Sequence, residues 1–170
     1  TDRIHIRPTD GVCVIGDGKL GLLCAQVLRL TGCDLLVVGR HADKLSILQK
    51  QGIATTTEAE SIRHQFDVVV DCTGHAGGFD LARQLTRPRG TLVLKSTFHG
   101  GRETAFAPFV IDEISIVGSR CGPFAPALRL LEKKLVEVDA MLSAEYPIEQ
   151  GVAAFERAAA PGVIKVQVVM

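Results

Sequence analysis

Short apolar runs alternate along the chain with longer segments in which apolar residues recur at helical spacing. The runs are rich in Val, Ile and Leu and contain few polar residues, which is typical of strands buried on both faces of a parallel sheet. The longer segments predict helices with an apolar face. The predicted strands are residues 12–15, 35–38, 53–55, 68–70, 91–94 and 114–117. The predicted helices are residues 19–31, 42–51, 79–85 and 125–135.

The connections between these segments carry turn and cap signals. Gly32 and Gly52 follow predicted helices, as glycine commonly does at a helix C-terminus. Thr57 and Glu60 have the spacing of a capping box, which predicts a short helix after the third strand. Residues 87–90, with the sequence Arg-Pro-Arg-Gly, predict a turn before the fifth strand.

This alternation of strands and helices predicts an α/β fold. We expect a doubly wound, mostly parallel six-stranded Rossmann sheet with helices on both faces, in three layers and with right-handed crossovers. Residues 1–170 are interpreted as a single Rossmann domain, a length sufficient for one buried core. Residues 163–168 alternate apolar and polar positions, which predicts a half-exposed strand, and residues 3–7 alternate in the same way.

A glycine-rich turn follows the first predicted strand and opens the first predicted helix. Its sequence is Gly16-Asp-Gly18-Lys-Leu-Gly21, the G-x-G-x-x-G spacing of dinucleotide-binding turns. Gly16 would permit the tight turn, Gly18 would let the backbone approach a pyrophosphate, and Gly21 would let the helix pack closely on the strand. Free N–H groups at the helix N-terminus would bind the phosphates, with Lys19 and Leu20 beside them. The alternative is a plain strand-to-helix turn.

The end of the second predicted strand bears on the choice of coenzyme. An NAD site usually carries Asp or Glu about 20 residues past the glycine motif, where it binds the ribose 2′-OH. This chain has Gly39 and Arg40 there, with Lys44 one helical turn further, while Asp34 lies at the opposite end of the strand. Arg40 can bind a 2′-phosphate or stack on adenine. We therefore expect NADP or NAD, with NADP slightly favoured, and expect Gly39→Asp to shift preference toward NAD.

Polar and small residues follow the last three predicted strands. Because ligands of open α/β sheets bind at the carboxyl ends of the strands, these residues are candidates for the ribose and nicotinamide path. The simpler alternatives are a turn for the first group and solvated surface charges for Lys95 and Arg120. The candidates are Cys72, Thr73 and Gly74, then Lys95 and Ser96, then Gly118, Ser119 and Arg120.

Charge and composition narrow the partners. The chain holds 19 Lys and Arg against 19 Asp and Glu, so it lacks the basic excess that a nucleic-acid binder usually shows. Its apolar runs are too short to cross a membrane, and its N-terminus does not resemble a signal peptide. The cysteine pattern, with five residues and no C-x-x-C pair, favours a reducing cytoplasm.

The cysteines and histidines predict no metal site in this chain. The five cysteines form no C-x-x-C pair, so we expect buried, reduced thiols. The five histidines are not paired with Cys or carboxylates at ligand spacing. His75 follows the fourth predicted strand and is interpreted as a loop histidine.

These motifs together resemble the C-terminal coenzyme domain of the medium-chain dehydrogenase/reductase superfamily, of the zinc-type alcohol dehydrogenase group. The resemblance covers nearly the whole chain, and the order and spacing of the motifs make it more specific than the glycines alone. The motifs that carry it are residues 14–21, 38–40 with 44–45, 69–74, 90–93, 116–120, and 154–155 with 158.

The resemblance implies hydride transfer between an alcohol carbon and nicotinamide. It implies that the catalytic zinc lies in an N-terminal domain preceding Thr1, so that this chain binds coenzyme but holds no catalytic residue. It also implies a homodimer formed through the strand at 114–117. A zinc-independent quinone or enone reductase and a non-catalytic dinucleotide sensor remain alternatives. The implied coenzyme contacts are Gly16, Gly18, Lys19, Leu20, Gly39, Arg40, Lys44, Thr73 and Gly118.

Overall fold

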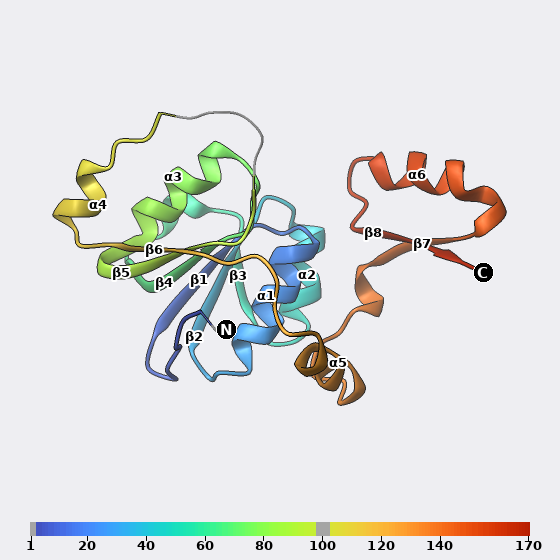
Figure 1. Ribbon diagram of the computed structural model, residues 1–170, viewed down its shortest axis with the longest axis horizontal. Coiled ribbons are helices and arrows are strands. Elements are labelled where there is room, and N and C mark those ends of the chain that lie inside the picture. Colours follow the sequence, from blue (N-terminus) through green and yellow to red (C-terminus); the bar gives the residue numbers. More distant parts are fainter. Residues whose placement is uncertain (1–2, 98–102) are drawn as a thin grey trace.

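A computed structural model describes residues 3–97 and 103–170 of the chain. Within these ranges a parallel six-stranded sheet has the order β3-β2-β1-β4-β5-β6 (Figure 1). His99, Gly100 and Gly101 lie outside the described residues. The strands are β1 Gly11–Ile15, β2 Asp34–Val38, β3 Ala54–Thr56, β4 Phe66–Asp71, β5 Thr86–Leu94 and β6 Ser115–Gly118. This order confirms the predicted doubly wound sheet, with its switch point between β1 and β4.

Helices cover both faces of the sheet because alternate strand residues point to opposite sides. Val12 and Val14 of β1 lie in one buried cluster with residues of α1 and α2, whereas Cys13 and Ile15 lie in a second cluster with residues of α3 and α4 (Figure 1). The sheet is therefore the middle of three layers. The helices are α1 Lys19–Arg29, α2 Ala42–Gln49, α3 Ala76–Leu85, α4 Ala107–Ile111, α5 Phe124–Glu132 and α6 Gly151–Ala159.

Two predicted connections differ from the structure. The short helix after β3 is a 3₁₀ turn, η1 Ala59–Ser61, with Glu58 at its N-cap and no side-chain cap bond, so Thr57 and Glu60 form no capping box. Instead, the Thr56 hydroxyl accepts the Glu58 N–H at 3.0 Å.

Residues 87–90 continue β5 rather than forming a turn. Thr86 already pairs with Phe66, and the register then shifts between Phe66 and Val68, with Arg89 in the left-handed region at φ 61°. The Asp67 carboxylate binds the Arg87 side chain at 2.7 Å, and this ion pair lies at the irregular start of the strand pair.

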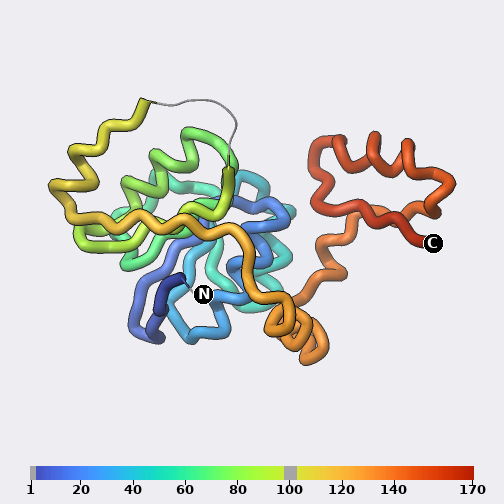
Figure 2. The backbone as a smooth tube through the Cα atoms, viewed as in Figure 1, coloured from blue at the N-terminus to red at the C-terminus, as the bar shows by residue number. Residues whose placement is uncertain are grey.

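The C-terminal segment forms a small unit of its own beside the Rossmann sheet. β7 Leu142–Pro147 and β8 Lys165–Val169 pair in parallel, with α6 between them in the chain (Figures 1 and 2). The predicted strand at 163–168 is thus present as β8, whereas the sequence pattern did not indicate β7, α6 or α4. Residues 3–7 form no strand, although Ile6 is buried in the core.

A buried side chain joins α1 to the segment that leads to this unit. The amide of Gln26, which is fully buried, donates to the Glu137 carbonyl at 2.9 Å and accepts the Glu137 N–H at 2.6 Å. The short 3₁₀ turns η2 Asp139–Met141 and η3 Ile148–Gln150 flank β7. The helices of the described residues include none long and apolar enough to span a membrane.

The cysteines are free thiols but differ in exposure. Cys13 is buried and Cys121 is exposed, while the other three are half-buried. The expectation of uniformly buried thiols is therefore wrong for Cys121, which lies in the connection between β6 and α5. Burial raises the pKa of the Cys13 thiol to about 12, so this side chain behaves as a small apolar residue of the core.

Candidate functional site

The three glycines after β1 have three different structural reasons to be glycine. Gly16 has φ 118°, which other residues rarely adopt, and its N–H donates to the Val38 carbonyl at 2.8 Å. A Cβ on Gly21 would lie 1.9 Å from the Gly16 carbonyl oxygen, so only glycine lets α1 approach the turn this closely. A Cβ on Gly18 would meet nothing within 4 Å. The protein itself therefore does not require glycine at position 18, and the space in front of it is open.

The N-terminus of α1 opens at Gly18 and faces this space. Gly18 is the N-cap in an extended conformation and makes no side-chain cap bond, and the first turn of the helix carries no acidic residue. Lys19 and Leu20 begin the helix beside it. Unbonded N–H groups and the positive end of the helix dipole bind anions at such positions. The turn can therefore hold a phosphate or pyrophosphate.

Asp17 lies where β2 ends, beside Gly39, Arg40 and His41, a place that we call the corner. The sequence pattern did not indicate Asp17. Its Oδ2 atom accepts the Arg40 N–H at 2.6 Å, the His41 N–H at 2.7 Å and the His41 Nδ1–H at 2.9 Å. A Cβ on Gly39 would lie 2.7 Å from the Asp17 Cβ, so position 39 is glycine because Asp17 fills the space beside it. The one available signal was a charged residue between the first two motif glycines.

The environment of Asp17 keeps it ionised. Its residue surface is only 8% exposed, and burial raises the pKa of the carboxyl group. The hydrogen bonds from the His41 and Arg40 N–H groups and from the His41 ring outweigh burial, so the pKa lies below its usual value. A carboxylate is thus fixed at the corner predicted to lack one.

A cavity of about 450 Å³ runs along the carboxyl ends of β1, β2 and β4. It joins the glycine turn, the end of β2 and the start of α3, as expected at the switch point of a doubly wound sheet. The predicted residues that line it are Gly16, Gly18, Gly39, Arg40, Lys44, Cys72 and Thr73. Residues that line it without having been predicted as coenzyme contacts include Asp17, His41, Thr57, Ala59, His75, Gly77, Gly78 and Leu81.

Predicted residues at the carboxyl ends of β4, β5 and β6 lie outside the lining of this cavity and contact one another. The Gly74 N–H donates to the Ser96 hydroxyl at 2.9 Å, and the Lys95 ammonium donates to the Arg120 carbonyl at 2.6 Å. Lys95 Nζ also lies 3.5 Å from the Ser119 hydroxyl, so the charge of Lys95 is bound to the loop after β6. These contacts join the ends of β4, β5 and β6. The predicted residues that do not line the cavity are Lys19, Leu20, Gly21, Gly74, Lys95, Ser96, Gly118 and Ser119.

The start of α3 is fitted closely to the loop after β4. The Thr73 hydroxyl donates to the buried Asp71 carboxylate at 2.7 Å, and a Cβ on Gly78 would lie 1.8 Å from that hydroxyl oxygen. His75 Nδ1 accepts the Gly78 N–H at 3.3 Å, so the imidazole caps α3. His75 thus has a structural role in addition to lining the cavity.

Cys72 forms part of the cavity wall and is not an activated nucleophile. A hydrogen bond with the Cys24 thiol of α1 raises the pKa of the Cys72 thiol, and burial raises it further. A neutral thiol reacts slowly with electrophiles, because the thiolate is the nucleophilic form. Cys72 therefore contributes shape and packing to the cavity.

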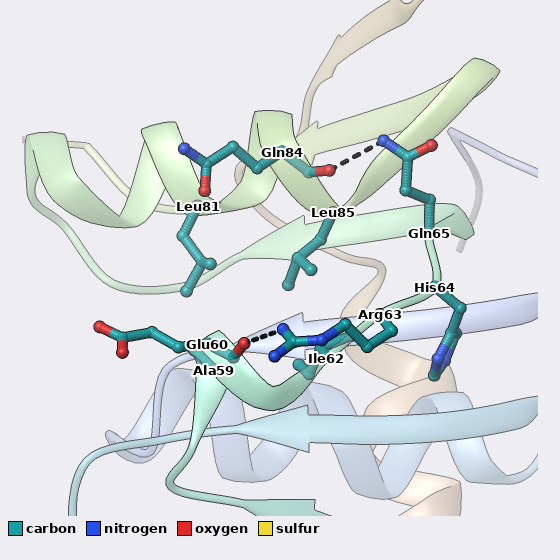
Figure 3. Close-up of a pocket in the computed structure, with 9 residues that line it drawn as sticks. All are labelled: Ala59, Glu60, Ile62, Arg63, His64, Gln65, Leu81, Gln84 and Leu85. Carbon is teal, nitrogen blue, oxygen red and sulfur yellow. Dashed lines mark hydrogen bonds between the residues drawn. The ribbon is translucent and has the colours of Figure 1, made fainter.

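A second cavity, of about 400 Å³, lies between η1 and α3 (Figure 3). Leu81 and Leu85 form an apolar side, and the Gln65 amide donates to the Gln84 carbonyl at 3.0 Å on its rim. Arg63 donates to the Glu60 carbonyl on the opposite side. The two cavities share Ala59 and Leu81 in their linings. The full lining is Ala59, Glu60, Ile62, Arg63, His64, Gln65, Leu81, Gln84 and Leu85.

Over residues 3–97 and 103–170, no group of three or more His, Cys, Asp or Glu side chains has an arrangement that could hold a metal ion. Structural and catalytic zinc sites need at least three such ligands. The described residues therefore do not fit a zinc ion.

Comparison with known proteins shows where this fold recurs. Residues 20–133 match a family model described as zinc-binding dehydrogenase. D-arabinitol dehydrogenase 1 of Uromyces fabae is 28% identical over 186 residues, a match that covers 98% of this chain and 53% of that protein. Sorbitol dehydrogenase of Halalkalibacterium halodurans is 28% identical over 165 residues, covering 87% of this chain and 48% of that protein.

Two solved structures match the fold of nearly the whole chain. A protein of Sinorhizobium meliloti 1021, solved with NADP bound, is 26% identical with a TM-score of 0.89, covering 99% of this chain and 55% of that one. A thermostable alcohol dehydrogenase of Pyrobaculum aerophilum, solved with cobalt and zinc, is 28% identical with a TM-score of 0.84, covering 99% and 53%. The chain thus spans about half the length of the curated relatives it matches.

Proposed function

Because the chain belongs to the zinc-binding dehydrogenase family, we propose that it is the coenzyme-binding domain of an NAD(P)-dependent oxidoreductase. The observation that carries the proposal is the open space in front of Gly18, at the N-terminus of α1, where the protein itself does not require a glycine. A pyrophosphate needs this close approach to the backbone. NADP bound in the Sinorhizobium meliloti structure supports the same use of the fold.

Each part of the cavity suits one part of a dinucleotide. The N–H groups at the start of α1 would hold the pyrophosphate, and the region between Arg40 and Leu81 would hold the adenosine. The nicotinamide would extend past Thr73 toward the loops after β5 and β6. When bound, the coenzyme supplies the hydride chemistry, and the chain's own residues bind and orient it. Arg40 and Lys44 support a 2′-phosphate at the adenosine end, whereas the Asp17 carboxylate opposes one.

We propose that the reaction interconverts an alcohol and a carbonyl compound and that its catalytic residues, with any zinc, lie in another part of a longer protein. The names of the two curated relatives support an alcohol substrate. The chain's coverage of about half of those relatives supports a second domain. On this proposal the present chain binds coenzyme and does not turn over substrate.

We further propose a homodimer in which β6 pairs with its counterpart in a second copy. β6 is the last strand in the sheet order, and Ser115, Ile116 and Gly118 of this strand are exposed. An exposed edge strand offers unpaired N–H and C=O groups to a second chain. The proposal makes the sheet continuous across a two-fold axis.

Titration calorimetry with NADH and NADPH tests the proposed coenzyme site. We expect saturable binding of at least one coenzyme to the wild-type chain. Gly18→Val should abolish this binding and leave the melting temperature within a few degrees of wild type, because a side chain at position 18 meets open space. Absence of binding to wild type, or unchanged affinity in the folded variant, would overturn the proposal.

A further inference from the structure

We infer that Asp17 is a specificity-determining residue that excludes the 2′-phosphate of NADP and selects NAD. The inference rests on the proposed coenzyme site, and concerns the corner where β2 meets the glycine turn. In Rossmann domains this corner receives the adenosine ribose, and the groups that follow the second strand distinguish a 2′-hydroxyl from a 2′-phosphate.

The backbone donors at this corner are already occupied. The Gly39 N–H donates to the Thr56 carbonyl of β3 at 3.1 Å. The Arg40 and His41 N–H groups both donate to Asp17 Oδ2, at 2.6 and 2.7 Å. Consecutive N–H groups that converge on one point form an anion-binding nest. Asp17 fills that nest with an anion from the protein itself, so no backbone N–H of residues 39–41 remains for a phosphate.

The carboxylate cannot easily leave the corner. Asp17 is 8% exposed, and the His41 Nδ1–H makes a third hydrogen bond to the same oxygen at 2.9 Å. The absence of a side chain at Gly39 provides the room that Asp17 occupies. Three converging donors and a fitted space thus fix a negative charge where a 2′-phosphate would have to sit.

The same arrangement suits an unmodified ribose. The three donors bind Oδ2, and no N–H or O–H group of the described residues donates to Oδ1. Oδ1 can therefore accept a hydrogen bond from a ribose hydroxyl, as the acidic residue at the end of the second strand does in NAD sites. Asp17 would perform this function from the glycine turn, although the end of β2 itself carries Gly39.

The positive side chains nearby do not reverse this preference. Arg40 and Lys44 line the cavity, and His41 is bound to Asp17. Arg40 is exposed, so water and salt screen its charge, whereas the Asp17 charge is buried beside the corner. A doubly charged phosphate would meet the buried carboxylate at short range, where electrostatic interactions are strongest.

The test is a titration of the chain with NADH and NADPH, followed by the fluorescence of the reduced nicotinamide. We expect wild type to bind NADH at least about 10-fold more tightly than NADPH. This ratio corresponds to about 1.4 kcal/mol of repulsion between the carboxylate and the 2′-phosphate. Asp17→Asn keeps the shape and one acceptor oxygen but removes the charge. It should raise the affinity for NADPH relative to NADH by about 10- to 100-fold. Asp17→Ser, which also opens the corner, should shift the ratio in the same direction.

A matched variant separates the corner from net charge. Asp43→Asn removes one exposed carboxylate from the first turn of α2, and the NADPH to NADH ratio should stay within about twofold of wild type. A wild-type preference for NADPH, or an unchanged ratio in Asp17→Asn and Asp17→Ser, would overturn the inference while the proposed site stands. If wild type binds neither coenzyme, the proposed site itself fails and the inference with it.

Discussion

Replacing Gly21 by alanine tests the close approach of α1 to the glycine turn. The new Cβ would lie 1.9 Å from the Gly16 carbonyl oxygen and 2.8 Å from its carbon. Reaching an ordinary contact distance requires a movement of about 1.5 Å between two backbone segments. Such overpacking costs about 3 kcal/mol, at the upper end of its usual range. Alanine recovers about 1 kcal/mol in helix propensity.

The net effect is a loss of about 2 kcal/mol in the free energy of unfolding, or about 4–8 °C in melting temperature for a chain of this size. Urea unfolding followed by circular dichroism measures it. Gly18→Ala is the matched control, because its Cβ meets nothing within 4 Å. It should cost less than about 1 kcal/mol while weakening coenzyme binding. If Gly21→Ala is as stable as wild type, the packing argument for this glycine is refuted.

Three further perturbations probe other parts of the fold. Gln26→Leu removes both hydrogen bonds to Glu137 and should cost about 2 kcal/mol in urea unfolding. Burial raises the pKa of Asp67, but hydrogen bonds from a β1 backbone N–H and from Arg87 outweigh it, so the folded pKa lies below its usual value of 3.8. This carboxylate therefore contributes stability above pH 3.8 that is lost as pH falls through the lower folded pKa. Ile116→Lys at the exposed β6 edge should convert a dimer into a monomer in light scattering.

Each of these has a clear contrary result. An unchanged unfolding free energy in Gln26→Leu would show that this contact does not anchor the C-terminal segment. Asp67→Asn should reduce the loss of unfolding free energy as pH falls below 3.8. An unchanged pH dependence would show that Asp67 does not contribute to stability in this way. A wild-type chain that is monomeric at all concentrations would contradict the proposed β6 pairing.

The Rossmann sheet could be predicted because its signals are local. Buried strands such as residues 68–70 are continuous apolar runs, and the structure confirms this strand. The glycine spacing of residues 16–21 predicts a tight turn with a closely packed helix, and the structure confirms that as well. The family resemblance is confirmed by the match over residues 20–133. α6 was missed although its sequence is amphipathic, and Ala154 is the one residue of this helix that is buried.

The corner at the end of β2 could not be predicted, because its chemistry depends on residues distant in sequence. Asp17 and His41 are brought together only when β1 and β2 pair. The sequence-based expectation for Gly39→Asp assumed an empty corner. The structure shows that any side chain at position 39 collides with Asp17, so this substitution would disturb the corner instead of simply adding a charge. The predicted turn at 87–90 was also wrong. These residues lie in an irregular part of β5, where Arg87 forms an ion pair with Asp67 of β4.

A crystal structure of the chain grown with the coenzyme that it binds tests the proposed pyrophosphate site at the glycine turn. We expect density for the pyrophosphate against the Gly18 backbone at the N-terminus of α1, with the adenosine in the cavity beside Arg40. Density for the dinucleotide in the cavity between η1 and α3, with the glycine turn empty, would contradict it.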